Sequence, residues 1–522
     1  MIGTTLGQAF AKAAFLWPDK VAIQDLRTEL TYRELDAQST SLAHTFAGLG
    51  IGYGDRVSVW MQNRVEYVVT ELALLKLGAL RVPMNQLVSD EEAQRRLDFT
   101  GAKIVVCGPE FLARANTIRA HLPQQPRIVA VGVEGAMPQD ALAWAALLAE
   151  RHAGPVTSPV GPEDPAAIMF TGGTTGQSKG IVHTHRTIMA TTFSCILEWG
   201  LRPEDVLLHA TPLPHGAGFM AFAGLVRGCR NVLLDKFTPD GFLQTVAREK
   251  VSWTFLVPTM LYTTLDSGML PRYDVSSLTS ILYGAAPMAP ARVAEALRAF
   301  GPVLVQAYAQ MEAINSGTLL SKTDHVEALK GAPERLASCG RPGLMPSIRI
   351  VNADMQDVAA GEVGEISIKS PHVMKEYWRD PEATARAVRD GWLLTGDLAR
   401  QDERGYVYIV DRTKDIIISG GMNVYSSMVE AALFAHPAIA TAAVFAVPDD
   451  KWGEAVRAHV VLRQGCSATE DELTSHCRAH LSRYEVPKQI AIVDALPMTP
   501  YGKIDKKVLR RPFWAGTSRN VG

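Results

Sequence analysis

Short apolar runs that alternate with helical stretches are the feature of this sequence that most restricts its fold. The runs are VSVWM at 57–61, KIVVC at 103–107, IVAV at 128–131 and AAIMF at 166–170. Their lengths and β-branched residues are typical of buried strands, and helical patterns of about 10 to 15 residues lie between them. Thr31 with Glu34, and Ser89 with Glu92, match the capping box that begins a helix. This alternation predicts an α/β fold with a mostly parallel sheet covered on both faces.

The character of the sequence changes in its second half. Past residue 340, short β-rich runs separated by Asp, Gly and Asn turns predict a smaller and more antiparallel unit. After Asp411 a mixed pattern of helices and strands returns, over a stretch long enough for an independent domain. We therefore expect a large N-terminal domain at 1–411 and a small α+β domain at 412–522.

The charge balance excludes one class of function. The 522 residues include 52 Lys and Arg against 54 Asp and Glu, a net charge of −2, so no basic excess is present to coat a nucleic acid. The six cysteines form no C-x-x-C pair, which predicts small buried side chains rather than disulfides or zinc ligands. No apolar run is long enough to span a membrane, and the N-terminus predicts an amphipathic helix rather than a leader. Together these patterns predict a protein of the reducing cytoplasm that binds no nucleic acid.

A loop rich in glycine and threonine directly follows the last of the four runs. It reads TGGTTGQSKG at 171–180. Glycines allow the backbone to approach phosphate oxygens, threonines supply hydroxyl groups, and Lys179 supplies a positive charge. The nearest generic alternative is the Walker loop, but that motif needs Gly before the Lys and Ser or Thr after it. Ser178 and Gly180 stand in those places, which leaves another kind of phosphate loop or a plain surface turn.

The loop resembles the phosphate-binding signature of the adenylate-forming superfamily, which includes acyl-CoA synthetases, firefly-type luciferases and nonribosomal adenylation domains. Gly172 replaces a usual Ser, and Ser178 replaces a usual Pro. Segments similar to other motifs of the superfamily follow in its order: YAQME at 308–312, LTGD at 394–397, DRTKD at 411–415, GGMNV at 420–424 and PMTPYGK at 497–503. The resemblance implies a large N-terminal domain of two α/β subdomains and a smaller β subdomain, followed by a small mobile α+β domain.

The resemblance implies a site for ATP and Mg²⁺. Glu312 and Thr171 would hold the magnesium ion, and a carboxylate is a hard oxygen donor that suits this cation. Asp397 and Arg412 would bind the ribose, and Tyr308 would stack on the adenine. Without the resemblance, Glu312 would be a surface helix charge, Asp397 a helix cap, and 284–287 a strand-end turn. The residues implied for ATP or AMP are Thr171, Gly172, Gly173, Thr174, Thr175, Gly176, Lys179, Gly284, Ala285, Ala286, Pro287, Gln306, Ala307, Tyr308, Ala309, Gln310, Met311, Asp397, Ile409 and Arg412.

Lys503 is the residue on which the implied chemistry depends most, with Glu312 and His215 as the other catalytic residues. A carboxylate is a poor electrophile, so its oxygen would attack the α-phosphorus of ATP, which gives an acyl-adenylate and releases pyrophosphate. Both reactants are anions, and a lysine between them offsets their repulsion by about 4 kcal/mol at roughly 4 Å and an effective dielectric near 20. By residue type alone, Lys503 would be a solvated lysine beside Lys506 and Lys507.

The resemblance also implies a second half-reaction, in which the C-terminal domain rotates and the thiol of CoA attacks the acyl-adenylate. Lys414 stands at the hinge position, and hinges are a few residues at the ends of elements. Gly420, Gly421 and Met422 would line the tunnel for the pantetheine arm, where a side chain at either glycine would obstruct passage. A simple hairpin turn at 420–421 is the alternative.

The acid pocket implied by the resemblance contains His215, Phe219, Val257, Met260 and Asn315. The segments that carry these residues have no Lys, Arg, Asp or Glu. An amino acid or a dicarboxylate would therefore bury a charge without a partner, so an apolar acid is predicted, whether fatty, alicyclic or aromatic. His215 would border the carboxylate and gate the thiol tunnel, and a satisfied core histidine is the alternative.

The predicted function is an ATP-dependent, AMP-forming ligase that joins an apolar carboxylic acid to CoA, as a monomer or homodimer. Two alternatives stay open: a ligase that loads a separate carrier protein, and a non-catalytic nucleotide-binding relative. Met311 and Met428 favour the non-catalytic relative because they replace a usual Thr and a usual Glu. The retained Lys503, Glu312 and Asp397 favour an enzyme.

Overall fold

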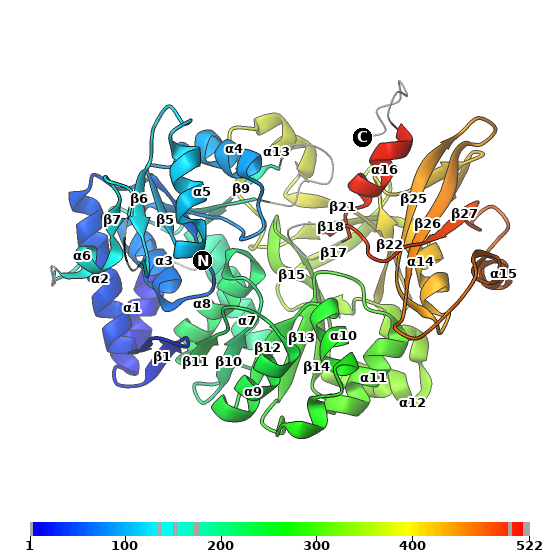
Figure 1. Ribbon diagram of the computed structural model, residues 1–522, viewed down its shortest axis with the longest axis horizontal. Coiled ribbons are helices and arrows are strands. Elements are labelled where there is room, and N and C mark those ends of the chain that lie inside the picture. Colours follow the sequence, from blue (N-terminus) through cyan, green and yellow to red (C-terminus); the bar gives the residue numbers. More distant parts are fainter. Residues whose placement is uncertain are drawn as a thin grey trace.

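The computed structural model describes residues 4–133, 135, 137–149, 152, 154–170, 178–498 and 504–514. Most of the predicted phosphate loop, residues 171–177, lies outside the described residues, and so does Lys503. The described part of the chain forms four β-sheets with helices packed against them (Figure 1).

The N-terminal sheet has eight strands. In order across the sheet they are β19 (Glu376–Tyr377), β9 (Gly180–Thr184), β8 (Pro165–Phe170), β4 (Leu80–Pro83), β3 (Arg56–Trp60), β5 (Ile104–Cys107), β6 (Arg127–Ala130) and β7 (Leu142–Ala143). The strands from β8 to β7 pair in parallel, and β9 pairs antiparallel with β8 and β19. The four apolar runs are β3, β5, β6 and β8, so the prediction of a mostly parallel sheet is confirmed.

The central sheet has nine strands. In order they are β16 (Arg341–Pro342), β15 (Ala313–Leu320), β14 (Leu304–Gln310), β13 (Ser280–Gly284), β12 (Trp253–Leu256), β10 (Val206–His209), β11 (Arg230–Leu233), β1 (Val21–Gln24) and β2 (Glu29–Thr31). The pairings from β14 to β1 are parallel, and β15, β16 and β2 add antiparallel edges. Half of the residues predicted for ATP or AMP lie in or directly after β13 and β14.

Two smaller sheets follow along the chain. The β unit contains β17 (Ser347–Val351), β18 (Gly364–Lys369), β21 (Trp392–Gln401), β20 (Val388–Arg389) and β22 (Val407–Arg412), all paired antiparallel as predicted. The C-terminal sheet contains β24 (Met422–Val424), β23 (Ile417–Ser419), β26 (Gly453–Leu462), β25 (Ile439–Asp449) and β27 (Gln489–Ile492). The fold is thus a large N-terminal domain followed by a smaller C-terminal α+β domain, while the exact boundary at 411 stays a prediction.

Helices pack on the faces of these sheets (Figure 1). They are α1 (Leu6–Leu16), α2 (Tyr32–Gly48), α3 (Val65–Leu77), α4 (Asp90–Thr100), α5 (Pro109–Arg119), α6 (Trp144–Ala149), α7 (His185–Glu198), α8 (Gly218–Arg227), α9 (Pro239–Glu249), α10 (Pro258–Asp266), α11 (Pro290–Phe300), α12 (Lys322–Gly331), α13 (Pro381–Ala387), α14 (Ser426–Phe434), α15 (Glu470–His480) and α16 (Lys506–Trp514). Shorter helical turns are η1 (Leu213–Ala217), η2 (Leu270–Arg272) and η3 (Pro333–Ala337).

Side-chain caps explain where several helices begin. Thr31 and Glu34 form the predicted reciprocal box at the start of α2. The second predicted box is only half formed, because the Ser89 hydroxyl accepts the Glu92 N–H but the Glu92 carboxylate turns to other partners. One of those partners is Ser178. The Glu92 carboxylate therefore binds a residue far along the chain instead of the Ser89 N–H, and the second half of the box does not form.

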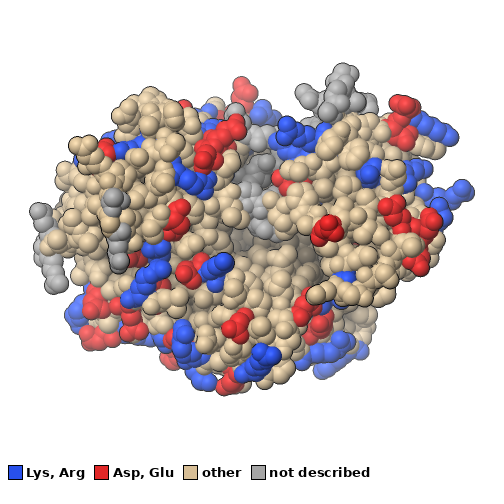
Figure 2. Space-filling view, in the orientation of Figure 1, with Lys and Arg blue, Asp and Glu red and all other residues tan. Residues whose placement is uncertain are grey.

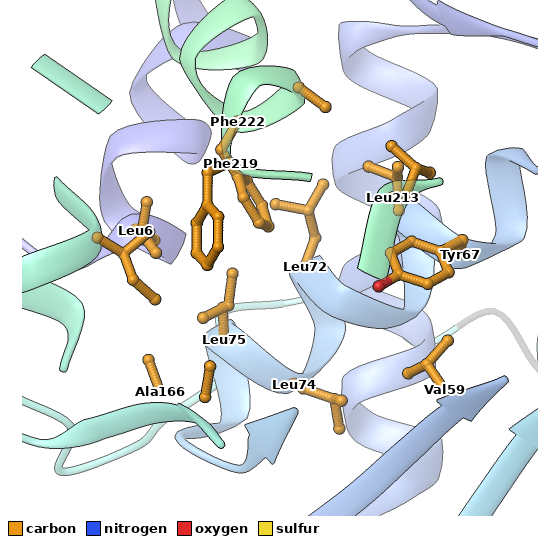
Figure 3. Packing of buried hydrophobic residues seen from close by; sticks show 14 of the residues in the cluster. Leu6, Val59, Tyr67, Leu72, Leu74, Leu75, Ala166, Leu213, Phe219 and Phe222 are labelled. Carbon is orange, nitrogen blue, oxygen red and sulfur yellow. The ribbon is translucent and has the colours of Figure 1, made fainter. Parts of the chain in front are cut away.

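Apolar side chains from α1, α3 and α8 meet in the largest core cluster. Figure 3 shows Phe219 and Phe222 of α8 pointing toward Leu72 of α3. α3 buries nearly every residue, as expected for a helix that is packed on all sides. An ion pair lies inside this core: Glu71 of α3 pairs with Arg81 of β4, and both side chains are 2% exposed or less.

The burial of the cysteines and the distribution of surface charges agree with most of what the composition predicts. Five cysteines are buried as predicted, but Cys466 is exposed in the loop after β26, so the prediction is wrong for this residue. On the face shown in Figure 2, Lys and Arg side chains are interspersed with Asp and Glu. Among the described helices, none combines the length and the apolar character needed to cross a bilayer.

Candidate active site

Asp397 is the point where the β unit meets the central sheet. It lies in β21 opposite Arg412 of β22, and Arg412 Nε is 3.2 Å from Asp397 Oδ1. Tyr308 and Gln310 of β14 donate to Asp397 Oδ2, at 2.7 Å from the tyrosine hydroxyl and 2.6 Å from the amide nitrogen. Asp397 therefore lies within a strand rather than at a helix cap. The structure brings together the residues predicted for the ribose and the adenine.

Further hydrogen bonds fix the backbone next to this carboxylate. Gly396 has a φ of 71°, a conformation that favours glycine, and its N–H donates to Glu365 Oε1 at 2.7 Å. The Thr395 hydroxyl donates to the Ile366 carbonyl at 2.8 Å. Glu365 was not predicted from the sequence, because it belongs to β18 and stands in none of the motifs. Ile409, predicted for the nucleotide, pairs with Ala399 in the neighbouring strand.

Glu312, the predicted magnesium ligand, lies in the turn that follows β14 and not on a surface helix. The Tyr377 hydroxyl donates to Glu312 Oε1 at 2.9 Å, and burial raises the pKa of the Glu312 carboxyl. Lys179 Nζ is 4.6 Å from the centre of the Tyr377 ring, so the described end of the phosphate loop lies beside the same tyrosine. Tyr377 was missed by the sequence analysis, although Tyr377 and Trp378 form an aromatic pair just before the Asp-Pro start of α13.

A histidine of the N-terminal sheet binds the backbone directly before Glu312. His183 of β9 is fully buried, and burial lowers the pKa of its ring to about 4. The neutral ring donates from Nε2 to the Met311 carbonyl at 2.7 Å. Met311, which replaces a usual threonine, therefore contributes its backbone carbonyl to this contact with His183.

Ser178, which replaces a usual proline, has a clear structural role. Arg95 Nη2 of α4 donates to the Ser178 carbonyl at 2.7 Å and to its hydroxyl oxygen at 2.6 Å. The Ser178 hydroxyl in turn donates to Glu92. Burial alone would raise the pKa of Glu92, but hydrogen bonds from Arg95, Ser178 and Arg96 outweigh it and lower this pKa to about 2. The C-terminal end of the phosphate loop is thus tied to α4 by a charged network.

Replacing Ser178 with alanine should raise the KM for ATP by about threefold to tenfold, because one hydroxyl within a charged network is lost. The KM for the acid should stay within about twofold, since the network lies at the phosphate loop. Steady-state kinetics with each substrate varied would measure both values. Ser89→Ala is the matched control, because it removes a cap from the same helix without touching the loop. An equal rise in both KM values would contradict the assignment.

The segment predicted to face the adenine lies at the end of β13. A Cβ atom on Gly284 would lie 2.3 Å from the Ala307 carbonyl oxygen, so close strand contact alone requires glycine there. Ala285 has a φ of 66° in the turn that leads to Ala286 and Pro287. In the adjacent strand, Gln306 accepts a hydrogen bond from the Tyr283 hydroxyl at 3.3 Å. The strand-end turn is therefore observed, and it lies beside Tyr308.

His215 lies in η1 with a non-helical backbone, at φ −123° and ψ −149°. The Asn85 side-chain amide donates to His215 Nε2. A neutral ring with this bond carries its proton on Nδ1. Asn85 was not predicted, because it lies just past β4 and stands in no motif.

A small hollow lies between α7 and the strands β14 and β15, and its lining includes one of the predicted acid-pocket residues, Asn315. Its lining consists of Ser194, Cys195, Glu198, Trp199, Ala307, Asn315, Gly317, Thr318, Leu319, Gly343 and Pro346. Phe219, Val257 and Met260 are not part of this lining. Phe219 is fully buried with the Arg81 guanidinium over its ring, and Met260 packs in a separate core cluster.

The predicted hinge lies in the turn between β22 and β23. Burial, and then the nearby Arg412, lower the pKa of Lys414 to about 8. The next residue, Asp415, forms an ion pair with Arg510 of α16, at 2.9 Å between the Asp415 oxygen and the Arg510 nitrogen. Lys506 of the same helix is paired with Glu430 at 2.8 Å, so two basic side chains of α16 form ion pairs with carboxylates.

Gly420 and Gly421 form the turn between β23 and β24, with φ values of 60° and 81°. Positive φ at both positions is typical of a tight hairpin. A Cβ atom on Gly420 would also lie 2.5 Å from the Trp452 ring. The hairpin alternative is therefore observed, and it explains both glycines without reference to a tunnel. Met422 begins the next strand with an exposed side chain.

Comparisons with known proteins agree with this arrangement. The model of the AMP-binding enzyme family matches residues 10–378, and that of the AMP-binding enzyme C-terminal domain matches residues 428–503. The medium/long-chain-fatty-acid–CoA ligase FadD8 of Mycobacterium tuberculosis is 36% identical over 95% of this chain and 88% of its own. A feruloyl-CoA synthase of an Amycolatopsis species is 35% identical over 97% and 99%. Among solved structures, the amide bond synthetase McbA of Marinactinospora thermotolerans has a TM-score of 0.88 at 32% identity, over 97% of this chain and 99% of its own.

Proposed function

The chain belongs to the AMP-binding enzyme family, and we propose that it activates an apolar monocarboxylic acid as an acyl-adenylate and transfers the acyl group to CoA. Its class is that of the AMP-forming acid–thiol ligases. The observation that carries the proposal is the meeting of three strands at Asp397. Tyr308, Gln310 and Arg412 surround this carboxylate, next to the strand that leads to Glu312.

In the first half-reaction a carboxylate oxygen of the acid attacks the α-phosphorus of ATP. The bond from that phosphorus to the pyrophosphate oxygen breaks, and acyl-adenylate and pyrophosphate result. We assign Asp397 and Arg412 to the ribose and Tyr308 to the adenine. Lys179 and the threonines at 171–175 are assigned to the phosphates that leave. Lys503 is assigned to the space between the carboxylate and the α-phosphate, where it offsets the repulsion of two anions.

Magnesium is proposed as a cation shared between Glu312 and phosphate oxygens of ATP. The Glu312 carboxylate fits this role because Tyr377 fixes one oxygen and burial disfavours its charge unless a cation is near. Within the described residues, no group of three or more His, Cys, Asp or Glu side chains could hold a metal by itself. Mg²⁺ is typically held by one or two carboxylates together with substrate phosphates, and it would neutralise charge on the leaving pyrophosphate. Thr171, the other predicted ligand, lies outside the described residues.

In the second half-reaction the sulfur of CoA attacks the acyl carbonyl carbon, the thioester forms, AMP leaves and the thiol proton is released. We place His215 beside the carbonyl, where its orientation is set by the amide of Asn85. We propose Gly420, Gly421 and Met422 as the tunnel segment of the rotated domain. A bare glycine hairpin suits this role because it adds no side chain to a narrow passage.

Lys414→Pro should slow transfer of the acyl group to CoA about tenfold more than it slows acyl-adenylate formation. Proline fixes φ near −65° and so restricts the hinge turn between β22 and β23. Single-turnover measurements of adenylate formation and thioester formation would give the ratio of the two rates. Lys414→Ala is the matched control, since it removes the charge but leaves the backbone free. If the proline variant keeps the wild-type ratio of rates, Lys414 is not the hinge.

The acid and the acceptor can be tested together. Fatty and aromatic acids appear in the names of the relatives, so the screen should include both kinds, with and without CoA. Acid-dependent exchange of labelled pyrophosphate into ATP is expected, followed by a thioester of the expected mass when CoA is added. Exchange without acyl-CoA would favour a carrier-protein acceptor, and no exchange with any acid would refute the ligase assignment.

We also propose a cytoplasmic location, because the cysteines are free thiols, as expected in a reducing compartment.

A further inference from the structure

Gln306 lies in β14, two residues before Tyr308 and on the same face of the strand, because side chains alternate between the two faces. The Tyr308 hydroxyl donates to Asp397, the carboxylate proposed for the ribose. Two residues of a strand span about 6–7 Å, which is similar to the reach from a ribose to the far edge of its purine base. Gln306 is therefore placed to meet the base of a nucleotide whose ribose is bound at Asp397.

A chain of buried hydrogen bonds leads from Gln306 into the protein. Tyr283 of β13 is the partner of Gln306 across the sheet, and its hydroxyl oxygen is 3.3 Å from Gln306 Oε1 and 2.9 Å from His325 Nε2. His325 belongs to α12, and its Nδ1 is 2.7 Å from the Ser321 carbonyl oxygen. Tyr283 and His325 are fully buried, whereas Gln306 is half-buried. Of these three side chains, Gln306 is thus the one that a bound molecule can reach.

The Tyr283 hydroxyl has one proton and two acceptors, His325 Nε2 and Gln306 Oε1. His325 Nδ1 faces a carbonyl oxygen, which can only accept, so this nitrogen carries the ring proton. Burial lowers the pKa of His325 to about 4, so the ring is neutral at pH 7 and its Nε2 needs a donor. A half-turn of the Gln306 amide satisfies all three groups, because the hydroxyl then donates to His325 and the amide N–H donates to the hydroxyl oxygen. The amide carbonyl oxygen then points away from Tyr283.

We propose that Tyr283 and His325 are positioning residues that hold the Gln306 amide with its carbonyl oxygen toward the base, so that the site selects a purine with an amino group there. The inference rests on the proposed function, since it needs the ribose at Asp397. Adenine presents an amine at this edge, whereas hypoxanthine has nearly the same shape and presents an oxygen. Hypoxanthine would bring two acceptors together, and turning the amide to avoid this would break its bond to Tyr283.

The dissociation constants of MgATP and MgITP, measured by isothermal titration calorimetry without any acid, test the proposal. ATP should bind the wild-type protein roughly tenfold to a hundredfold more tightly than ITP, as expected when a mismatch leaves polar groups unpaired. Tyr283→Phe frees the amide to turn and should lower this ratio by about tenfold. His325→Leu leaves the Tyr283 proton to Gln306 Oε1, which holds the amide in the opposite sense, so the ratio should fall to one or below. The Ser321 carbonyl still accepts the backbone N–H of residue 325, so the start of α12 is preserved.

Two variants are the matched controls, and both should keep most of the preference for ATP. His325→Gln supplies a side-chain oxygen that can replace Nε2 as acceptor. Tyr406→Phe removes a hydroxyl that donates to Asp324, the neighbour of His325, at 2.5 Å, and so tests whether loss of any hydrogen bond at α12 has the same effect. Because both constants come from one sample, a partly folded variant does not distort their ratio.

The outcomes separate this inference from the proposed function. Equal binding of ATP and ITP by the wild-type protein would overturn the inference while leaving nucleotide binding intact. A ratio that is unchanged in both Tyr283→Phe and His325→Leu would also overturn it, and so would an equal fall in Tyr406→Phe. Binding of neither nucleotide to the wild-type protein would refute the proposed function as well.

Discussion

Replacing Lys503 with alanine should lower the rate of acyl-adenylate formation by about a hundredfold or more, as expected for loss of one preorganised electrostatic group. The acid carboxylate and the α-phosphate are both anions, and no neutral side chain can offset their repulsion. Conversion of supplied acyl-adenylate to the thioester should stay near the wild-type rate, because that step joins a neutral carbonyl to a thiol. Rapid-quench assays of each half-reaction would measure the two rates separately.

Lys507→Ala is the matched control for this experiment. Lys507 lies four residues further along, in the first turn of α16, and its side chain is exposed. Loss of this charge should change both half-reactions by less than about twofold, as expected for a solvated lysine. An equal loss of both half-reactions in Lys503→Ala, or a similar loss of adenylation in the control, would reject the assignment of Lys503.

The sheets could be predicted because buried parallel strands leave a local pattern. β3, β5, β6 and β8 are short apolar runs between helices, and each was recognised without knowledge of its neighbours. β19 could not be recognised in this way, because it is a two-residue strand that pairs with β9 from almost 200 positions away. Its Tyr377 nevertheless holds Glu312, so an edge strand without a local pattern completes the candidate site.

The candidate site was only partly predictable for the same reason. Asp397, Arg412 and Tyr308 stand in motifs, and the structure brings Tyr308 and Arg412 each within hydrogen-bond distance of Asp397. Asn85 and Glu365 stand in no motif, and only the fold places them beside His215 and Gly396. Residue type and spacing do not encode such partners, because each comes from a segment far along the chain from the residue it contacts.

The segments predicted for the acid pocket carry no charge, but residues outside those segments also lie beside Asn315. Glu198 belongs to α7, outside the segments that carry the predicted acid-pocket residues, and it lines the same hollow as Asn315. Phe219, also predicted for the acid pocket, is fully buried under the Arg81 guanidinium and does not line this hollow. A helix that packs against a sheet contributes to the hollow only through those positions that face it, and one sequence cannot show which positions these are.

The second large effect is expected at the buried ion pair of Glu71 and Arg81. Arg81→Met should lower the free energy of unfolding by about 3–5 kcal/mol, because it leaves a carboxylate buried without its partner. Methionine can still pack against Phe219 and Phe222, over whose rings the guanidinium lies at 4.8 and 5.2 Å. Urea unfolding followed by tryptophan fluorescence would measure the change.

The double variant Glu71→Leu/Arg81→Met is the control, since it removes both charges and leaves an apolar core. It should regain most of the lost stability, because replacing a whole buried pair by apolar residues is often neutral or stabilising. A double variant that is as unstable as Arg81→Met would show that packing, and not the unpaired charge, causes the loss. A loss below about 1 kcal/mol in the single variant would show that Glu71 finds another partner or protonates at little cost.

The loss in Arg81→Met should also depend on pH, with a sign that follows from Glu71. Burial raises the pKa of Glu71, and Arg81 opposes that rise, so removing the arginine raises this pKa further. A carboxyl whose pKa is higher in the folded state than in the unfolded state binds more protons when folded. Its stabilising effect is complete below the unfolded pKa, near 4.5, and is lost as the pH rises through the folded pKa. Arg81→Met should therefore be closest to wild type in mild acid and least stable at neutral and alkaline pH, and the double variant should show no such trend.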